Sequence, residues 1–340
     1  MAIANTALTL DDLPPPPPGK TGWPWTEQNN PLPALMPDGS EWPRISIVTP
    51  SYNYGRFIEE TIRSVLMQGY PNLEYVIIDG GSTDNTVEVI KKYEKYLAYW
   101  VSEPDKGQTN AINKGYQHGT GDIFSWINSD DSYITSTALQ NVSQLYLDGY
   151  KFIAGRCLNV FNNGAEDIID SVPTSFKRYL RFWLHKALPQ PSVFVTREIA
   201  DKCFPLDTGL YILMDYQLFL RILSQNPKSI YVDKVWTRIK YHGDNKTLSN
   251  YKGGLAEWHK IVLAESKKLS DIERQLFLLD VDDYMVLYPL IENQYSNTPP
   301  KVLASLIARP TLVRWIVFWK LLVKAFIGKQ YLALRGMKNQ

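Results

Sequence analysis

Hydrophobic and polar positions follow a regular order between residues 44 and 130. Apolar runs of strand length occur at residues 45–49, 75–78, 98–101 and 123–127. Between them, apolar side chains recur at helical spacing over residues 57–66, 86–97 and 108–118. Because strands and helices alternate, this order predicts a parallel sheet covered by helices on both faces. The expected fold class is therefore α/β.

The alternation of strand and helix patterns becomes less regular after residue 150. There we expect two further strands, at residues 192–196 and 229–232, and one helix at residues 214–223. These elements would complete the sheet and cover one end of it. The remainder of the chain has a mainly helical pattern. The sequence therefore predicts three parts: an N-terminal tail at 1–41, a sheet domain at 42–250 and a helical region at 251–340.

The N-terminal part is rich in proline, with five consecutive prolines at Pro14–Pro18. Such a run favours an extended polyproline helix and forms no core of its own. We interpret this segment as a tail or strap, with a proline-binding partner as the alternative. The first residues lack a basic start followed by an apolar run, so no secretion signal is expected.

Composition sets broad limits on function. Hydrophobic content is 44% and charged content 21%, which suits a globular protein with a full core. The formal net charge is +1 and supports no whole-protein argument for nucleic-acid binding. Cys157 and Cys203 have no metal-ligand spacing, and we expect buried thiols in a reducing compartment.

Charge is unevenly distributed along the chain. Residues 301–340 carry eight Lys or Arg and no acidic residue, leaving 28 basic and 35 acidic residues in the first 300. Within this basic tail we expect an amphipathic helix over residues 311–327. Its cations Arg314, Lys320 and Lys324 share one half of the wheel, and the apolar half carries Trp315, Trp319, Leu322, Val323 and Phe326.

That distribution is typical of a helix lying in a membrane interface, with the basic side toward anionic headgroups. The alternative is a helix packed on the rest of the protein. The segment is too charged for a comfortable membrane span. We therefore expect a cytoplasmic protein held peripherally on the inner face of the plasma membrane.

Polar clusters follow the expected strands at their carboxyl ends. These clusters are Pro50-Ser51, Asp79-Gly80-Gly81, Glu103-Pro104-Asp105 and Asp130-Asp131. In parallel sheets, ligands bind beyond the carboxyl ends of the strands. We therefore expect one binding site along this edge.

Asp130 and Asp131 follow an apolar strand directly. Carboxylates at the end of a buried strand need a partner, and a divalent cation that also holds a diphosphate is the simplest one. The alternative is structural, because Asp often closes such turns with its own hydrogen bonds.

The segment Asp79-Gly-Gly-Ser-Thr-Asp84 follows a strand and opens a helix. Its glycines allow a ligand to approach the backbone closely, and Asp79 could accept a bond from a base or a ribose. The loop Glu103–Asn110 could hold a ribose or diphosphate, with Lys106 or Lys114 providing positive charge. Both segments have a structural alternative as capped turns. Neither matches a P-loop or a dinucleotide motif.

Taken in order, these motifs resemble the family 2 glycosyltransferases. The resemblance rests on Thr49-Pro-Ser-Tyr-Asn53, Ser64–Gln68, Glu74–Asp84, Gly107–Gly115 and Gly121–Asp131, and it extends to about residue 247. It implies a GT-A (Rossmann-like) fold, with a mixed, mainly parallel sheet flanked by helices and a helical C-terminal extension. It also implies a nucleotide-diphosphate-sugar donor and inversion at the anomeric carbon.

The resemblance assigns roles by position. Pro50, Tyr52 and Asp79 would hold the nucleoside. The segment Asn128-Ser-Asp130 occupies the place of the family's Asp-x-Asp motif, so Asp130 would be the principal ligand of Mn²⁺ or Mg²⁺. The full set of expected nucleotide-sugar-binding residues is Pro50, Tyr52, Asn53, Asp79, Gly80, Asp105, Gln108, Asn110, Asn128 and Ser129.

The first position of that motif is Asn128, where the family has Asp. The change removes one negative charge and bears on metal affinity more than on activity. The expected metal set is Asp130, Asp131 and His242. His242 lies in a segment that resembles the family's late Arg-x-His motif in a loose register, and a structural role is its alternative.

Asp215 falls where the family carries its catalytic Asp, and a sugar hydroxyl needs such a base as it attacks. The physical alternative is a helix-start carboxylate favoured by the macrodipole. Asp207 is the nearest competing carboxylate.

We therefore expect a glycosyltransferase that uses a nucleotide sugar, with UDP favoured, and a glycan or lipid-linked acceptor of surface polysaccharide. The alternative is an inactive nucleotide-sugar-binding or scaffold protein. Nucleotidyl transfer would need a basic, Gly-rich loop after the first strand, which the sequence lacks. No nucleic-acid partner is expected.

Overall fold

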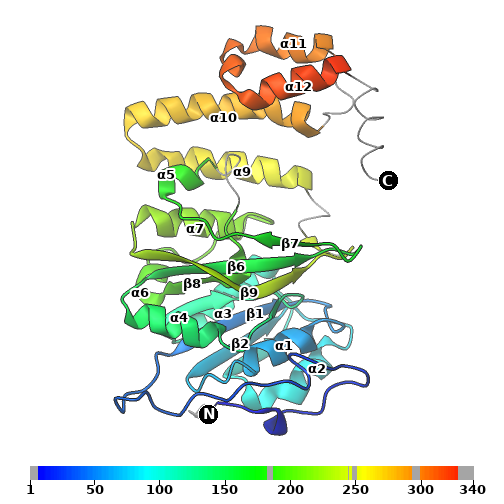
Figure 1. Cartoon of the computed structure of the whole chain (residues 1–340), viewed down its shortest axis with the longest axis vertical. Coiled ribbons are helices and arrows are strands. Elements are labelled where there is room, and N and C mark those ends of the chain that lie inside the picture. Colours follow the sequence, from blue (N-terminus) through cyan, green and yellow to red (C-terminus); the bar gives the residue numbers. More distant parts are fainter. Residues whose placement is uncertain (1–6, 182–186, 244, 247–250, 293–298, 328–340) are drawn as a thin grey trace. The chain divides into compact units, whose positions relative to one another are not determined.

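The computed structural model describes residues 7–181, 187–243, 245–246, 251–292 and 299–327. They divide into two compact units, Met1–Ile261 and Val262–Gln340, which are described separately (Figure 1). The first unit holds the sheet and the residues expected to form the site. The second unit is helical.

The described part of the first unit contains a nine-stranded mixed sheet in the order β3-β2-β1-β4-β8-β6-β9-β5, with β7 paired to β6. The strands are β1 Ile45–Ser51, β2 Leu73–Asp79, β3 Tyr99–Ser102, β4 Ile123–Trp126, β5 Ser132–Tyr133, β6 Phe152–Val160, β7 Glu166–Ile169, β8 Val193–Thr196 and β9 Ser229–Lys240.

The helices of this region are α1 Ile58–Leu66, α2 Thr86–Tyr93, α3 Gln108–His118, α4 Ala138–Leu147, α5 Phe176–Tyr179, α6 Arg197–Ala200 and α7 Met214–Ser224.

The strands β1 to β4 form the parallel half that the sequence predicts. β1 pairs in parallel with β2 and β4, and β2 pairs in parallel with β3. Every residue of β1 is buried, including Ser46, Thr49 and Ser51, as expected of a strand covered on both faces. The carboxyl ends of these strands meet at one edge, as expected. The predicted mixed, mainly parallel sheet flanked by helices is confirmed.

The other half of the sheet is less visible in the sequence. The expected strand at residues 229–232 is only the start of β9, which continues to Lys240 and pairs in parallel with β6. The sequence analysis missed β6 because its apolar run is interrupted by Gly155 and Arg156. A Cβ at Gly155 would lie 2.3 Å from the Trp236 ring, so this glycine lets a large aromatic side chain pack on the strand.

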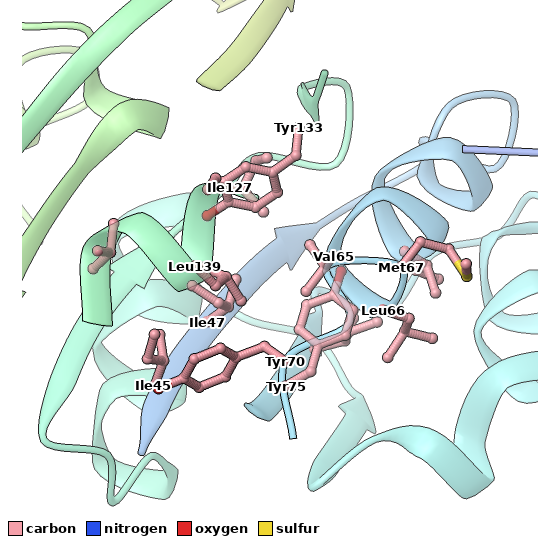
Figure 2. Packing of buried hydrophobic residues seen from close by; sticks show 14 of the residues in the cluster. Ile45, Ile47, Val65, Leu66, Met67, Tyr70, Tyr75, Ile127, Tyr133 and Leu139 are labelled. Carbon is pink, nitrogen blue, oxygen red and sulfur yellow. The ribbon is translucent and has the colours of Figure 1, made fainter. Parts of the chain in front are cut away.

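The main hydrophobic core lies between the sheet and its helices (Figure 2). Ile45 and Ile47 of β1 meet Val65 and Leu66 of α1 there, together with Leu139 of α4. All are at most 3% exposed, so these elements are fixed by apolar burial. The two cysteines are buried free thiols, as expected.

Residues 7–43 lie against this core, to which Leu13 and Trp42 belong, and they also surround one buried cation. Arg63 of α1 is 1% exposed. Its guanidinium donates hydrogen bonds to the main-chain oxygens of Pro14 at 2.7 Å, Pro24 at 3.2 Å and Trp25 at 3.0 Å. A buried guanidinium needs such acceptors, so the proline-rich segment supplies part of the surroundings of α1.

The C-terminal region is helical, as predicted, in its described residues. Its helices are α9 Tyr251–Glu265, α10 Asp271–Glu292, α11 Pro299–Ala308 and α12 Ile316–Ile327. The boundary between the two units falls within α9. No helix in the described residues is long and apolar enough to cross a membrane.

The helix expected over residues 311–327 begins later than predicted. Residues Pro310–Arg314 form a 3₁₀ turn, and α12 starts at Ile316. The buried face of α12 carries Phe318 and Leu321, which join an apolar cluster with side chains of α10 and α11. Of the predicted apolar face, Trp315 and Leu322 also pack against this cluster, Trp319 and Val323 are exposed, and the side chain of Phe326 lies outside the described residues.

Candidate active site

Asp79 ends β2 and organises the turn that follows. Its carboxylate accepts the main-chain N–H of Gly81 at 3.2 Å and of Ser82 at 2.8 Å, and the hydroxyls of Ser82 and Ser102. Asp79 is 0% exposed. The structure therefore gives this carboxylate a role in fixing the turn where a nucleoside is expected.

Gly80 and Asp105 bring two of the expected loops together. A Cβ at Gly80 would lie 3.1 Å from Oδ1 of Asp105, so the glycine lets the loop after β3 approach the end of β2. The same Asp105 oxygen accepts the N–H of Gly107 at 2.7 Å. Asp105 is half-buried and remains accessible at the sheet edge.

The residues that follow β1 join the same edge. Pro50 is buried within the strand, whereas the Tyr52 side chain is 58% exposed. Asn53 has a positive φ of 56°, and its side-chain oxygen accepts the N–H of Thr83 at 2.8 Å. These contacts fix the loop after β1 against the turn after β2 and leave the Tyr52 ring facing solvent.

Asp130 lies beyond β4 in contact with His242. The His242 Nε2 atom is 3.1 Å from Asp130 Oδ2, and Asn245 Nδ2 donates to the same oxygen at 3.1 Å. The His242 ring stacks on Phe57 with centroids 4.4 Å apart, which fixes its orientation. Burial raises the pKa of Asp130, and its bonds to His242 and Asn245 oppose that rise. Two of the three expected metal ligands are thus adjacent.

Asn128 connects Asp131 to α3. Its amide nitrogen donates to Asp131 Oδ2 at 3.1 Å, and its oxygen accepts from Gln108 Nε2 at 2.7 Å. Burial and the neighbouring Asp130 raise the pKa of Asp131 well above its ordinary value. A carboxylate at position 128 could not donate to Asp131, so the departure from Asp-x-Asp has a local physical reason.

Two other expected residues have mainly structural surroundings. Ser129 is 4% exposed, and its main-chain oxygen accepts the Thr61 hydroxyl at 3.0 Å. Asn110 is half-buried in the first turn of α3. Of the expected cations, Lys114 pairs with Glu103, and Lys106 is exposed.

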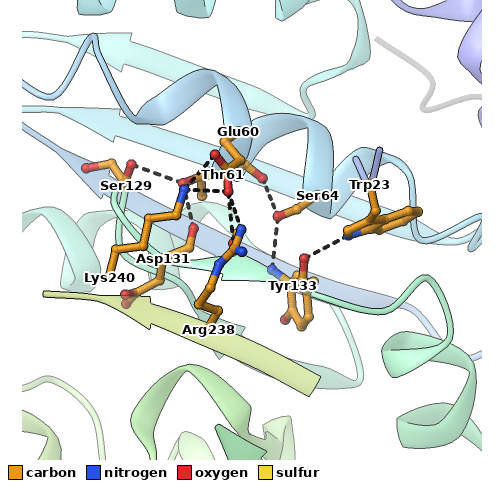
Figure 3. Close-up of polar contacts among 10 residues, drawn as sticks. Trp23, Glu60, Thr61, Ser64, Ser129, Asp131, Tyr133, Arg238 and Lys240 are labelled. Carbon is orange, nitrogen blue, oxygen red and sulfur yellow. Dashed lines mark hydrogen bonds and ion pairs between the residues drawn. The ribbon is translucent and has the colours of Figure 1, made fainter. Parts of the chain in front are cut away.

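The sequence analysis missed an ionic cluster on β9 (Figure 3). Glu60 of α1 accepts Lys240 Nζ at 2.6 Å on both oxygens and Arg238 at 2.5 Å. Burial opposes ionisation of Glu60, but these two cations outweigh it and hold its pKa below the ordinary value. The spacing of Arg238 and Lys240, two residues apart on one strand face, was the available signal. The cluster ties β9 to α1 beside Asp131.

Lys246 is a second functional candidate that the sequence analysis did not single out. Its Nζ lies 3.8 Å from the centre of the Tyr211 ring and 3.3 Å from Gln108 Oε1. Burial lowers the pKa of Lys246. The side chain therefore brings a cation to Gln108, whose amide also binds Asn128.

Asp215 is the second residue of α7 and is half-buried. Its Oδ1 accepts the N–H of Tyr216 at 2.7 Å. Burial raises the pKa of Asp215 to about 6, against the lowering effect of nearby backbone N–H groups. Such a carboxyl is poised to exchange a proton near neutral pH, which is the property of a general base.

No group of three or more His, Cys, Asp or Glu side chains in the described residues forms a ready metal site. The pair Asp130–His242 therefore needs oxygen atoms from another molecule to complete a coordination sphere. A diphosphate would provide them.

The fold is that of the GT-A glycosyltransferases. S. aureus TarS 1–349, solved in complex with UDP-GlcNAc, matches with a TM-score of 0.56 at 17% identity, covering 77% of this chain and 79% of that one. The mannosyltransferase PcManGT from Pyrobaculum calidifontis, solved in complex with GDP-Man and Mn²⁺, matches with a TM-score of 0.51 at 16% identity, covering 86% and 88%.

Sequence comparison matches part of the chain to a known family. Residues 46–204 match the model of Glycosyl transferase family 2. An uncharacterised glycosyltransferase of Mycobacterium tuberculosis is 27% identical over 190 residues, 53% of this chain and 68% of the relative. TuaG of Bacillus subtilis, named for teichuronic acid biosynthesis, is 36% identical over 96 residues, 27% of this chain and 37% of the relative. Residues 46–204 thus match a family 2 glycosyltransferase domain, as their motifs predicted.

Proposed function

We propose that this chain is an inverting glycosyltransferase that moves a sugar from a nucleotide-diphosphate sugar to a hydroxyl of a glycan or lipid-linked acceptor. The observation that carries the proposal is the division of roles between two carboxylates. Asp130 is bound to His242 beyond β4, whereas Asp215 has a pKa of about 6 at the start of α7. The first arrangement suits a diphosphate with a cation, and the second suits a base.

On the donor side, Tyr52, Asp105 and the Gly80 turn line the carboxyl edge of the sheet. We assign the nucleoside to this part and UDP to the donor, because TarS was solved with UDP-GlcNAc. PcManGT was solved with GDP-Man, so GDP is the competing base. The remaining expected donor contacts are Pro50, Asn53, Asp79, Gln108, Asn110, Asn128 and Ser129.

The donor atoms present fit a divalent cation such as Mn²⁺ or Mg²⁺. A carboxylate and an imidazole, completed by diphosphate and water oxygens, are common ligands of such ions. Asp130 and His242 would hold the ion, with Asp131 as the third expected ligand. When bound, the ion supplies charge that stabilises the leaving diphosphate.

Asp215 takes the proton in the proposed reaction. The acceptor hydroxyl oxygen forms a bond to the anomeric carbon while the bond from that carbon to the diphosphate oxygen breaks. The diphosphate leaves with the electron pair, and the hydroxyl proton passes to Asp215. Attack from the face opposite the leaving group inverts the anomeric configuration.

The test is donor binding and turnover across a panel of nucleotide sugars, with and without Mn²⁺ or Mg²⁺. Wild type should bind and slowly hydrolyse one donor in a metal-dependent manner. Asp130→Ala should weaken binding, and Asp215→Asn should retain binding and lose turnover. The wild-type protein could bind a donor and yet transfer its sugar to none of the glycan or lipid-linked acceptors supplied. That result would favour the scaffold alternative. No binding to any donor in the presence of metal would reject the proposal.

We also propose that α12 contacts an anionic membrane surface from the cytoplasmic side, which would suit an acceptor used in surface polysaccharide. Ile316 is 73% exposed, Trp319 46% and Val323 55%. These positions share one helix face, and Lys320 lies exposed beside it. Apolar side chains next to a cation are the composition of an interfacial helix.

Vesicle sedimentation tests this contact. Binding to vesicles of phosphatidylcholine with phosphatidylglycerol should fall on Ile316→Ser, on Lys320→Glu and at high salt. Ile272→Ser is the matched control, since Ile272 is 74% exposed on α10 between Asp271 and Glu273. Equal loss in both serine variants, or no vesicle binding by wild type, would reject the membrane contact.

A further inference from the structure

Glu257 of α9 makes an unusual set of hydrogen bonds. Its carboxylate accepts three consecutive main-chain N–H groups, from Tyr211 at 2.5 Å, Ile212 at 2.9 Å and Leu213 at 2.9 Å. Charge-assisted bonds of this kind are stronger than bonds between neutral groups. One side chain thus fixes the conformation of three successive residues.

These residues lead directly into α7. Leu213 is the N-cap of that helix, its own side chain makes no capping bond, and Asp215 follows two positions later. Backbone N–H groups at a helix start need acceptors. The Glu257 carboxylate therefore meets the helix at the point that sets the position and direction of the Asp215 side chain.

The opposite side of the same loop is held by α3. Thr109 donates to the Leu210 oxygen at 3.1 Å, and Asn113 exchanges two hydrogen bonds with the main chain of Leu206, at 2.8 and 3.0 Å. Loop 206–213 is thus bound on one side to the helix that begins at Gln108 and on the other to α9. Loss of the α9 contact would leave the entry to α7 held from one side.

We propose that Glu257 is a positioning residue for Asp215, which it serves by fixing the turn before α7 and by adding a negative charge near the base. This inference rests on the proposed role of Asp215. Glu257 is remote in sequence from every motif of the family 2 domain and lies outside the matched residues 46–204. It would tie the geometry of the base to the helix that leads into the C-terminal unit.

The groups that act on Asp215 come from several elements. Burial is the main cause that raises the pKa of Asp215, and the like charge of Glu257 on α9 raises it further. The Tyr179 phenol on α5 also interacts electrostatically with Asp215, but burial and Asp215 itself raise the pKa of this phenol, so it stays neutral. Glu257 is thus the neighbouring charge whose removal should lower the pKa of the base.

Glu257→Gln is the informative variant. Its amide has one acceptor oxygen, and its NH₂ group would face an N–H donor, so at least one of the three bonds is lost. We expect kcat to fall about 10- to 100-fold with donor KM nearly unchanged, because small displacements of a reacting group have such effects. The acid limb of the pH–rate profile should also move to lower pH, since the base loses a like charge.

Glu88→Gln is the matched control, on the exposed face of α2. It should change neither kcat nor the pH profile. A Glu257→Gln enzyme with wild-type kcat and an unmoved acid limb would overturn the proposal. So would a loss of kcat explained wholly by unfolding, which thermal melting and donor binding would reveal.

A second measurement separates this inference from the proposed function. The Asp215 carboxyl can be titrated by ¹³C NMR in wild type and in Glu257→Gln, whether or not an acceptor is known. A lower pKa in the variant supports the contact with Glu257 even if the chain transfers no sugar. An unchanged pKa rejects the electrostatic part of the proposal, while full activity of Asp215→Asn would reject the base and leave the titration result standing.

Discussion

Each unit holds a carboxylate whose pKa is shifted, and the two carboxylates differ in how many hydrogen-bond donors surround them. Asp283 of α10 is 0% exposed and accepts hydrogen bonds from Arg309 at 3.0 Å, Arg314 at 2.9 Å, Trp315 at 2.8 Å and the hydroxyl of Thr311. Asp215 of α7 is only half-buried, yet the one hydrogen bond that the described residues give it comes from the N–H of the next residue.

Their pKa values diverge for this reason. Burial raises the pKa of both carboxyls, but at Asp283 the donors from Thr311, Trp315, Arg314 and Arg309 outweigh it and the pKa falls below the ordinary value. At Asp215 burial dominates, and the pKa reaches about 6. A carboxylate with a full set of donors stabilises a fold, whereas one left short of donors retains a proton affinity that chemistry can use.

The largest effect is expected at Asp215. Asp215→Asn should lower kcat/KM about 10²- to 10⁴-fold, since a general base contributes that much. Donor affinity should stay within a few-fold, which equilibrium titration with the nucleotide sugar would measure. Asp148→Asn, an exposed carboxylate at the end of α4, is the control. Retained activity in Asp215→Asn would remove the functional side of the comparison.

Asp283→Asn should instead damage stability. The change removes the charged acceptor that Arg309 and Arg314 share, and a hydrogen bond to a charged group contributes about 1.5–3 kcal/mol. Denaturant unfolding would measure the loss of stability, and amide hydrogen exchange in α10 would show whether it arises there. Asp282→Asn is the matched control, because Asp282 binds the same Arg309 at 2.9 Å with a side chain 57% exposed, and surface pairs contribute about 0–1 kcal/mol. Equal effects would mean that the donor set does not distinguish Asp283.

The pH dependence of stability should have opposite signs at the two sites. Asp215 binds a proton more tightly when folded, so its contribution is present below about pH 4 and is lost as pH rises toward about 6. Asp215→Asn should therefore stabilise the protein at neutral pH, by at most about 3 kcal/mol. The Asp283 contribution is present above its ordinary pKa and is lost as pH falls through its lowered value. The measurement is the unfolding free energy of each variant relative to wild type between about pH 3 and about pH 8. If these differences change with pH in the same direction for both variants, the prediction is wrong.

A smaller effect is expected at the edge beside Asp130. Asn128→Asp would remove the donor to Asp131 and add a third carboxylate, which should lower stability by about 1–3 kcal/mol at neutral pH. Mn²⁺ should restore part of the loss. Thermal unfolding with and without Mn²⁺ would measure both, with Asn163→Asp in an exposed loop as the control. A more stable Asn128→Asp protein without metal would contradict the proposed reason for Asn128.

Much of the fold was predictable from local pattern. The apolar runs that became β1, β2 and β4 reflect burial on both faces of a parallel sheet, and the helical spacing in α1 and α3 reflects one buried helix face. β3 was also predicted, although its residues are only partly buried. The order of the motifs after these strands also placed Tyr52, Asp79 and Asp130 at one edge. By contrast, β6 and most of β9 carry polar or glycine interruptions that local periodicity does not explain.

What the sequence by itself determined is the parallel half of the sheet, the resemblance to the family 2 glycosyltransferases and the residue types available at the carboxyl edge of the sheet. Only the tertiary structure decided which of those residues meet. Glu60 reaches Lys240 across 180 residues, Asp130 reaches His242 across 112, and Glu257 reaches Leu213 across 44. Periodicity reports the face on which a side chain lies, but the strand order and the packing of α9 on the loop before α7 determine its partner, and the partner sets the charge and proton affinity of each carboxylate.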